Sequence, residues 1–236
     1  MFQAADAMRS LAEMADTLVD DYDVVDLLTG LADQCVSLFG VSAAGVMLAS
    51  PEGRLGLVAS SSEAMRLLEL FELQAQEGPC LDAFRTGERV EHQDLEAESG
   101  RWTSFSATAL REGFQSVSAL PLRFRDVTLG ALNLFSVTQA RMSEPDVTAV
   151  RAFADLATLS IVQHRASVEA QRVNDQLSAA LASRVVIEQA EGVLAGRAGV
   201  DLAEAFSRLR VYARDHKLRL TDVAQATVAG TLDPLA

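Results

Sequence analysis

Apolar residues recur at helical spacing in three stretches near the C-terminal end of the chain. The first ends at a glycine-containing break at residues 196–199, the second follows Asp201, and the third starts at Thr221. Within each stretch the apolar positions lie three or four residues apart, which places their side chains on one face of a helix. Asp201 followed by Glu204 is the pattern of a capping box, in which side chains accept free backbone N–H groups at a helix start. The pattern predicts a three-helix module over residues 182–231.

The first part of the chain shows short apolar runs separated by turn residues, a pattern typical of strands and short helices. The expected strands cover residues 43–49, 55–60, 89–92, 116–122 and 127–135. The expected helices cover residues 2–19, 23–40, 62–76, 81–84 and 102–111. Hairpins at both ends of this series, with helices between them, predict a mainly antiparallel sheet with a helical cover, hence an α+β fold.

A long helix is expected to connect these two parts. From Ser143 the helical pattern continues without a break to Gly192. The apolar positions with the spacing of a helix–helix seam are Val147, Val150, Ala154, Ala157 and Ile161, followed on a shifted stripe by Val173, Leu177 and Leu181. We predict one connecting helix over residues 143–181, which pairs with its counterpart as a coiled coil in a homodimer. The alternative is a pair of unrelated helices that meet near Asn174.

The three C-terminal stretches carry blocks that resemble the ANTAR domain in the family's order. The blocks are IEQAEGVL at 187–194, AFSRLRVYA at 205–213 and KLRLTDVA at 217–224. The family comprises RNA-binding output modules of bacterial transcription antiterminators. The resemblance implies binding of paired RNA hairpins in nascent transcripts, so that an overlapping terminator cannot form. Glu191 stands where the family usually has Lys, and a carboxylate repels phosphate. That departure keeps open a second interpretation, a signalling scaffold that has lost RNA binding.

Cationic side chains gather at one end of this module, where they could contact phosphate oxygens. Arg184 could join them, although Glu188 lies one turn away and is a natural ion-pair partner. Tyr212 could stack on a base, whereas Phe206 belongs to the apolar stripe and is expected in the core. The predicted RNA-binding residues are Arg184, Arg210, Tyr212, Arg214, Lys217 and Arg219. The alternative is a solvated helix face with ordinary salt bridges.

The blocks of the first part resemble a GAF domain, in particular those coupled to ANTAR modules in actinobacteria. They are EGPCLDA at 77–83, SALPL at 118–122 and LGALNL at 129–134. The resemblance implies a sensory sheet, one face of which forms a pocket for an unknown small molecule beneath the connecting helices. The predicted domains are an N-terminal helix at 1–19, a GAF sensor at 20–142, the connecting helix at 143–181 and the ANTAR module at 182–231.

Charge is distributed unevenly between the two parts. The formal net charge of the 236 residues is −13, which by itself argues against a nucleic-acid binder. Residues 1–181 hold 13 Lys or Arg against 26 Asp or Glu, whereas residues 182–230 hold seven against six, a net charge of +1. A module with so little charge must depend on shape, RNA loops and two linked copies. We expect no DNA partner.

Candidate catalytic chemistry is limited. The two Cys and three His show no spacing typical of a metal site, and no catalytic residue or cofactor is predicted. Cys80 follows Gly-Pro near an expected helix start, where N–H groups can lower a thiol pKa. A GAF-type thiol redox enzyme or sensor is therefore an alternative function, and simple packing is the other interpretation of Cys80. The candidate ligand-pocket residues are Cys80, His92 and Trp102.

The N-terminal stretch carries Asp6, Glu13 and Asp16, where a signal peptide would carry a basic patch. No segment reaches the roughly eighteen uninterrupted apolar residues of a membrane-spanning helix. We therefore expect a cytoplasmic protein without a membrane partner.

Overall fold

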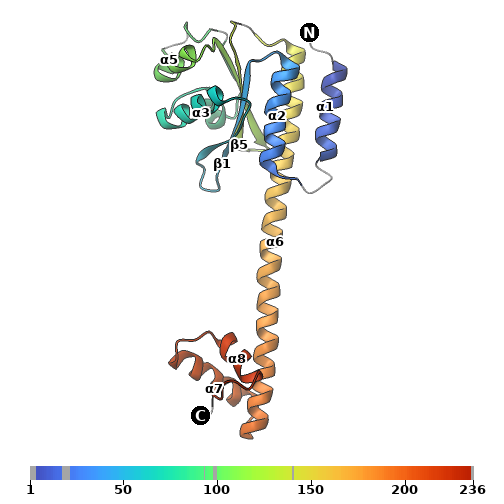
Figure 1. The fold of residues 1–236 in the computed structure, drawn as a ribbon, viewed down its shortest axis with the longest axis vertical. Helices are drawn as coiled ribbons and strands as arrows, with labels where there is room; N and C mark the ends of the chain where they lie inside the picture. Colours follow the sequence, from blue (N-terminus) through green and yellow to red (C-terminus); the bar gives the residue numbers. More distant parts are fainter. Residues whose placement is uncertain (1–3, 18–21, 93, 98–99, 140, 235–236) are drawn as a thin grey trace. The chain divides into compact units, whose positions relative to one another are not determined.

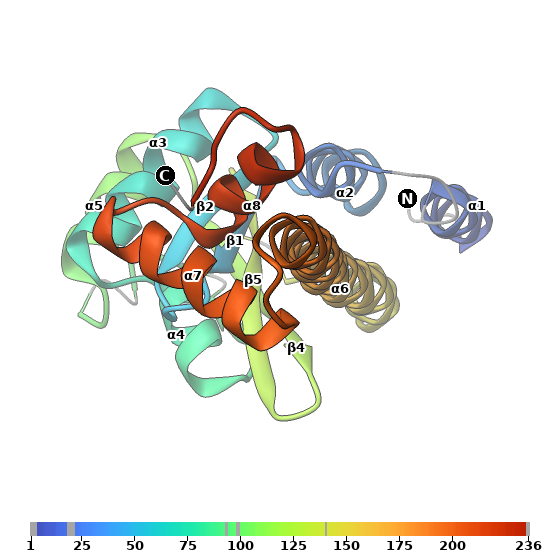
Figure 2. The same ribbon diagram turned by 90° about the horizontal axis from the view of Figure 1, so that it is seen from below.

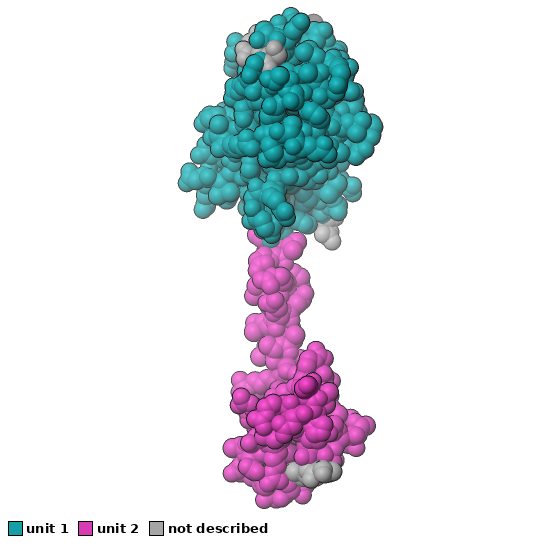
Figure 3. Space-filling model, turned by 90° about the vertical axis from the view of Figure 1, so that its left-hand side faces the viewer, with its two compact units in different colours: residues 1–165 teal, residues 166–236 magenta. Residues whose placement is uncertain are grey.

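The computed structural model describes residues 4–17, 22–92, 94–97, 100–139 and 141–234. The chain divides into two compact units, residues 1–165 and 166–236 (Figure 3). Residues 2, 3, 18 and 19 of the predicted N-terminal helix lie outside the described residues. The predicted limits of the four domains stay a prediction.

Unit 1 alternates helices and strands along the chain. Its helices are α1 (Ala4–Thr17), α2 (Val24–Phe39), α3 (Glu63–Ala75), α4 (Pro79–Thr86), α5 (Thr103–Arg111) and the first part of α6 (Glu144–Ala198). Its strands are β1 (Ala43–Ala49), β2 (Leu55–Ser60), β3 (Val90–His92), β4 (Ser116–Phe124) and β5 (Val127–Ser136). Each expected strand and helix of the described residues is present, with ends that differ by a few positions.

The strands form one sheet in the order β2-β1-β5-β4-β3, and every neighbouring pair is antiparallel. The two expected hairpins are present: β1–β2 contains the first two strands in the sequence, and β4–β5 contains the last two. Gly53 has a φ of 79° in the first turn, and Arg125 has a φ of 56° in the second. The antiparallel sheet with a helical cover confirms the predicted α+β class.

Helices cover both faces of the sheet (Figures 1 and 2). Successive side chains of a strand point to opposite faces, so Val46 and Leu132 join one core with α1, α2 and the first part of α6. Met47 and Phe135 point the other way and join a second core with α3, α4 and α5. The sheet is therefore the middle layer of three.

α6 is a single helix of 55 residues. It passes through Asn174 without interruption, so the alternative of two helices meeting there is wrong. It also passes Gly192 and ends before Gly199, which has the left-handed φ of 66° that commonly follows a helix end. The predicted break at 196–199 therefore begins only at Gly199.

Unit 2 packs α7 (Leu202–Asp215) and α8 (Leu220–Val228) against the last part of α6. Its buried core consists of Ala190, Leu194, Ala205, Leu209, Ala213, Val223 and Ala224. The carboxylate of Asp201 accepts a hydrogen bond from the backbone nitrogen of Glu204 at 2.8 Å, as the capping pattern predicts. The three-helix module predicted from the periodicity is confirmed.

Candidate functional site

Most of the predicted RNA-binding cations lie exposed beside a carboxylate. The Nε atom of Arg184 lies 2.8 Å from Glu188. In the same way, Arg214 lies 3.1 Å from its neighbour Asp215. Ion pairs of this kind on a solvated surface contribute little to stability. Their main effect here is to offset positive charge that phosphate would otherwise meet.

Two cations of the set differ from the others. Arg210 and Lys217 are exposed and have no ion-pair partner among the described residues. The remaining cation, Arg219, is paired with Asp222 at 2.8 Å. Lys217 lies in the turn between α7 and α8, where its φ is 56°. The structure places these cations around the end of α7.

Tyr212 stacks on His216 one turn further along, with ring centroids 4.0 Å apart and planes inclined by 17°. The Nδ1 atom of His216 lies 2.9 Å from the carbonyl oxygen of Tyr212, which fixes the second ring over the first. Both rings and Arg208 line a groove of about 330 Å³. One face of the predicted stacking residue is therefore already covered by another ring.

Glu191 lines a second hollow of unit 2, of about 410 Å³, together with Arg184 and Phe206. Phe206 is only half-buried, so its assignment to the core was wrong. The core positions of α7 are Ala205 and Leu209, and these turn Phe206 toward the hollow instead. Glu191 thus lines the same hollow as Arg184, one of the predicted RNA-binding cations, two turns away on α6.

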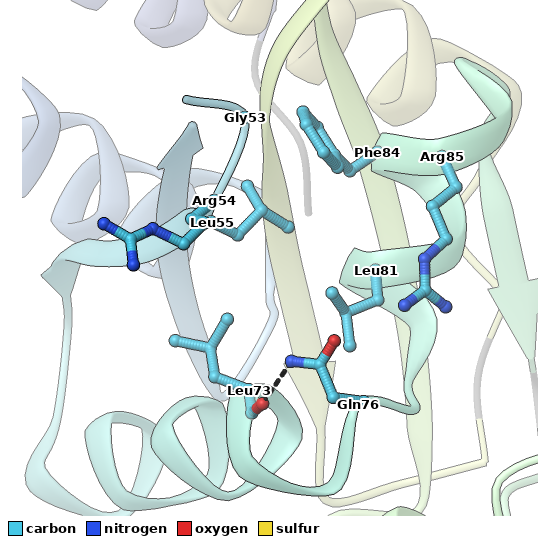
Figure 4. A pocket seen from close by; sticks show the side chains of 8 residues that line it. All are labelled: Gly53, Arg54, Leu55, Leu73, Gln76, Leu81, Phe84 and Arg85. Atoms are coloured by element: carbon cyan, nitrogen blue, oxygen red, sulfur yellow. Dashed lines mark hydrogen bonds between the residues drawn. The ribbon is translucent and has the colours of Figure 1, made fainter. Parts of the chain in front are cut away.

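In unit 1 a cavity of about 370 Å³ opens between the β1–β2 turn, α3 and α4 (Figure 4). Its lining is mixed: three leucines and a phenylalanine stand beside a glutamine and two exposed arginines. The lining residues are Gly53, Arg54, Leu55, Leu73, Gln76, Leu81, Phe84 and Arg85. The Nε2 atom of Gln76 donates to the carbonyl oxygen of Leu73 at 2.6 Å, which holds the amide across the end of α3.

The three predicted pocket residues occupy the same layer of unit 1 but do not line that cavity. Trp102 is buried, and its Nε1 donates to Asp82 at 3.0 Å, while the His92 ring meets the indole edge to face at 4.6 Å. Cys80 is fully buried, with Sγ 3.8 Å from the carbonyl oxygen of Ala131. Their contact with a ligand stays a prediction.

Burial raises the pKa of the Cys80 thiol well above its usual value, and the charges of Glu72 and Glu69 raise it further. The backbone N–H groups at the start of α4, which could have favoured a thiolate, already donate to another side chain. The Oε1 atom of Glu72 accepts from the backbone nitrogen of Cys80 at 2.7 Å and from that of Leu81 at 3.2 Å. With its pKa raised in this way, chiefly by burial, Cys80 stays a neutral thiol at neutral pH.

Glu69 and Glu72 on α3 are both completely buried, and the sequence interpretation missed them. Burial raises the pKa of Glu72 to about 8, although its hydrogen bonds oppose the shift. Burial also raises the pKa of Glu69, and the nearby Glu72 adds to it. The available signal was spacing, because Met65, Glu69 and Glu72 lie four and then three residues apart, on the buried stripe of α3.

Two negative findings apply to the described residues. None of the helices there is both long and apolar enough to cross a membrane. Within the same residues, no three His, Cys, Asp or Glu side chains are grouped so that they could hold a metal ion.

Comparison with family models identifies both parts of the chain. Residues 21–162 match the model described as the GAF domain, and residues 175–228 match the model described as the ANTAR domain. The first match covers more than half of the chain. A search of curated proteins found no match.

Solved structures share the fold of the first part. The free methionine-R-sulfoxide reductase from Neisseria meningitidis is 20% identical with a TM-score of 0.55, covering 71% of this chain and 97% of that chain. The GAF domain of an Acinetobacter phosphoenolpyruvate-protein phosphotransferase is 14% identical with a TM-score of 0.54, covering 70% and 97%. The phycocyanobilin-bound GAF domain of a cyanobacterial phytochrome is 15% identical with a TM-score of 0.54, covering 66% and 94%. At these identities the likeness concerns the fold alone.

Proposed function

Because the chain belongs to the GAF domain family and also carries an ANTAR domain, we propose that it is a signal-responsive regulator that promotes transcription antitermination. The GAF domain is the sensor, and the ANTAR domain is the RNA-binding output. The observation that carries this proposal is the presence of both domains in one chain, joined by the single helix α6.

In this proposal the ANTAR module contacts hairpins in nascent transcripts. Arg210 and Lys217 offer charge that no described carboxylate offsets, so they are the first candidates for phosphate contacts. To contact phosphate, the other three cations must first leave their carboxylate ion-pair partners; these are Arg184, Arg214 and Arg219. Tyr212 must use its open face, or leave His216, to stack on a base.

A homodimer is supported by the middle of α6. Every side chain from residue 163 to residue 182 is exposed, including Val173, Leu177 and Leu181, which are 51%, 57% and 57% exposed. Isolated helices in water are marginal and gain most of their stability by packing an apolar face. A second copy of α6 would cover this stripe. Sedimentation analysis should then show a dimer at micromolar concentration, and a strictly monomeric protein would contradict it.

Dimerisation would also explain how a module with a net charge of +1 can bind RNA. Once one module of the dimer has bound the first hairpin, the linked second module is held near the second hairpin at a high effective concentration. Two weak contacts together then give a usable affinity. The test is a filter-binding titration with an RNA of two adjacent stem–loops. Arg210→Ala/Arg214→Ala should weaken binding, whereas Arg172→Ala, which removes an exposed cation from the middle of α6, should not. Equal affinity of all three proteins would refute the RNA-binding role and favour the scaffold interpretation.

The thiol redox alternative finds little support. A catalytic thiol must reach its substrate as a thiolate, and Cys80 is buried with a raised pKa. The reductase among the similar structures acts on free methionine-R-sulfoxide, as its title states, but the likeness to it concerns the fold only. Turnover of methionine sulfoxide that is lost in Cys80→Ser would revive this alternative.

A further inference from the structure

The cavity between the β1–β2 turn, α3 and α4 differs in charge from the chain as a whole. The 236 residues carry 33 Asp or Glu against 20 Lys or Arg, yet the lining of this cavity contains Arg54 and Arg85 and no acidic side chain. Both arginines are exposed, and neither has an ion-pair partner among the described residues. Two cations that no carboxylate offsets therefore stand at one hollow of an acidic protein.

Apolar side chains lie between the two arginines. Figure 4 shows Arg54 on one side of the cavity and Arg85 on the other, with three leucines and a phenylalanine between them. These apolar residues are Leu55, Leu73, Leu81 and Phe84. Three of the four are only partly buried in the folded chain, so apolar surface remains that a bound molecule could remove from water.

Gln76 adds a further donor to this lining. It ends α3 with a φ of 58°, a left-handed conformation that residues other than glycine seldom adopt. Its Nε2 atom donates to the carbonyl oxygen of Leu73 at 2.6 Å. A side-chain amide nitrogen carries two hydrogens, so the second N–H can donate to a ligand. The lining therefore offers donors from three side chains, and its only side-chain acceptor is the amide oxygen of Gln76.

The middle of the same sheet face is already filled by side chains. A Cβ atom at Gly45 would collide with the carboxylate of Glu69, and Cys80 and Trp102 are buried in the core on that face. The space for a ligand lies instead beside the β1–β2 turn, in the cavity of about 370 Å³. That volume is near the lower end of the range of roughly 300–1,000 Å³ that is usual for small-molecule sites.

We infer that this cavity binds a small organic acid, whose apolar body covers the leucines and the phenylalanine and whose carboxylate pairs with a guanidinium group at the mouth. A guanidinium group can bind one carboxylate through two parallel hydrogen bonds, and the second arginine adds attraction for the same charge. The inference rests on the sensor role proposed above and names the class of signal.

A carboxylate fits this site better than a phosphate. Phosphate sites commonly use the free N–H groups at a helix start. At the start of α4 the backbone nitrogens of Cys80 and Leu81 already donate to Glu72. The two arginines remain as the charged donors of the cavity, and they would repel an amine.

The test is calorimetric titration of the full chain with the sodium salts of straight-chain carboxylic acids from acetate to octanoate. Affinity should rise by up to about fourfold with each added CH₂ group until the cavity is full. Hexanoate should bind more tightly than 1-hexanol and hexylammonium chloride, and its affinity should fall as the salt concentration rises. No binding by any carboxylate, or equal binding of hexanol or hexylammonium, would overturn the inference.

Arg54→Gln/Arg85→Gln removes both charges and should weaken hexanoate binding by about tenfold or more, while binding of hexanol stays the same. The matched control is Arg151→Gln, which removes an exposed cation of α6 within unit 1. Unchanged hexanoate affinity in the double variant would contradict the assignment. If that variant does not fold, the salt dependence of hexanoate binding to the unaltered protein decides the matter.

Hairpin RNA binding, measured on the same protein, tests the regulator role separately from this acid site. A protein that binds RNA but no carboxylate would overturn the acid site and leave the regulator role standing.

Discussion

The Oε1 atom of Glu72 lies 2.7 Å from the backbone nitrogen of Cys80 and so caps a helix to which Glu72 does not belong. α4 begins after Gly78, which has no side chain to accept the first free N–H groups. A Cβ atom at Gly78 would collide with the Glu72 carboxylate. Because Gly78 has no side chain, the carboxyl group of Glu72 from the preceding helix can take the capping position and accept the free N–H groups of α4.

Removing this cap should destabilise unit 1. Glu72→Ala leaves two buried N–H groups without an acceptor, and we expect the free energy of unfolding to fall by about 2–3 kcal/mol. Urea unfolding followed by circular dichroism measures the change. Glu63→Ala on the exposed side of α3 is the control and should stay within about 0.5 kcal/mol of the native protein. A similar small change in Glu72→Ala would show that the cap contributes little.

Stability should fall as the pH rises from about 5 to 8. The pKa of Glu72 is raised to about 8 in the folded chain, so the folded state holds a proton that the unfolded state has lost. The resulting stabilisation is fully present below the unfolded pKa and is lost as the pH rises through the folded pKa, at up to about 1.4 kcal/mol per pH unit. Thermal unfolding from pH 5 to 8 should show this slope, and Glu72→Gln should flatten it. Parallel curves for both proteins would count against a proton held at this site.

Asp82 fastens the single tryptophan of the chain. Its Oδ2 atom accepts from Trp102 Nε1 at 3.0 Å and from Arg101 at 2.8 Å. Asp82→Ala leaves a buried indole N–H without a partner, so we expect a loss of about 1–3 kcal/mol and a red shift of the tryptophan emission. Asp126→Ala, in the exposed β4–β5 turn, should change neither. An unshifted emission spectrum in Asp82→Ala would argue that the indole is held by packing alone.

The stripe on α6 should decide the oligomeric state. Leu177→Glu places a charge in the proposed seam and should shift the protein toward monomer in sedimentation velocity. Affinity for an RNA with two stem–loops should then fall as well, because the second contact is no longer linked to the first. Gln171→Glu adds the same charge on a different side of the helix and serves as the control. A Leu177→Glu protein that stays dimeric would place the interface elsewhere.

Glu191 should limit RNA affinity if it faces RNA beside Arg184. Glu191→Lys is then expected to tighten hairpin binding and to steepen the slope of log K against log salt by about one unit. Glu191→Gln should have a smaller effect in the same direction. Filter binding at several salt concentrations measures both quantities. An unchanged slope in the lysine variant would show that position 191 lies away from the phosphates.

The local sequence pattern was sufficient to predict the ends of those helices that begin at one capping side chain or end at one glycine. The carboxylate of Asp23 caps α2 through the backbone nitrogen of Val25 at 2.6 Å, and Gly40 ends that helix with a φ of 65°. Asp201 does the same for α7. These signals are readable because donor and acceptor lie within a few residues of each other.

Local pattern failed where distant segments meet. On α3, Leu67 is 51% exposed while Glu69 is fully buried, the reverse of what hydrophobicity alone favours. Glu69 is accommodated by Gly45 and Glu72 by the start of α4, and neither partner can be deduced from α3 itself. Phe206 was misplaced for a similar reason, since smaller neighbours fill the core of unit 2.

The exposed middle of α6 sets a rule for anyone who joins this ANTAR domain to another GAF domain. Its side chains between residues 163 and 182 are exposed within one chain, so those outside the proposed seam of Val173, Leu177 and Leu181 are open to exchange. The number of residues in this stretch cannot be changed freely. Deleting one residue turns all that follows by about 100° around the helix axis, whereas deleting seven turns it by only about 20°. Chimeras should therefore be cut and joined in whole heptads, with the phase of the helix preserved.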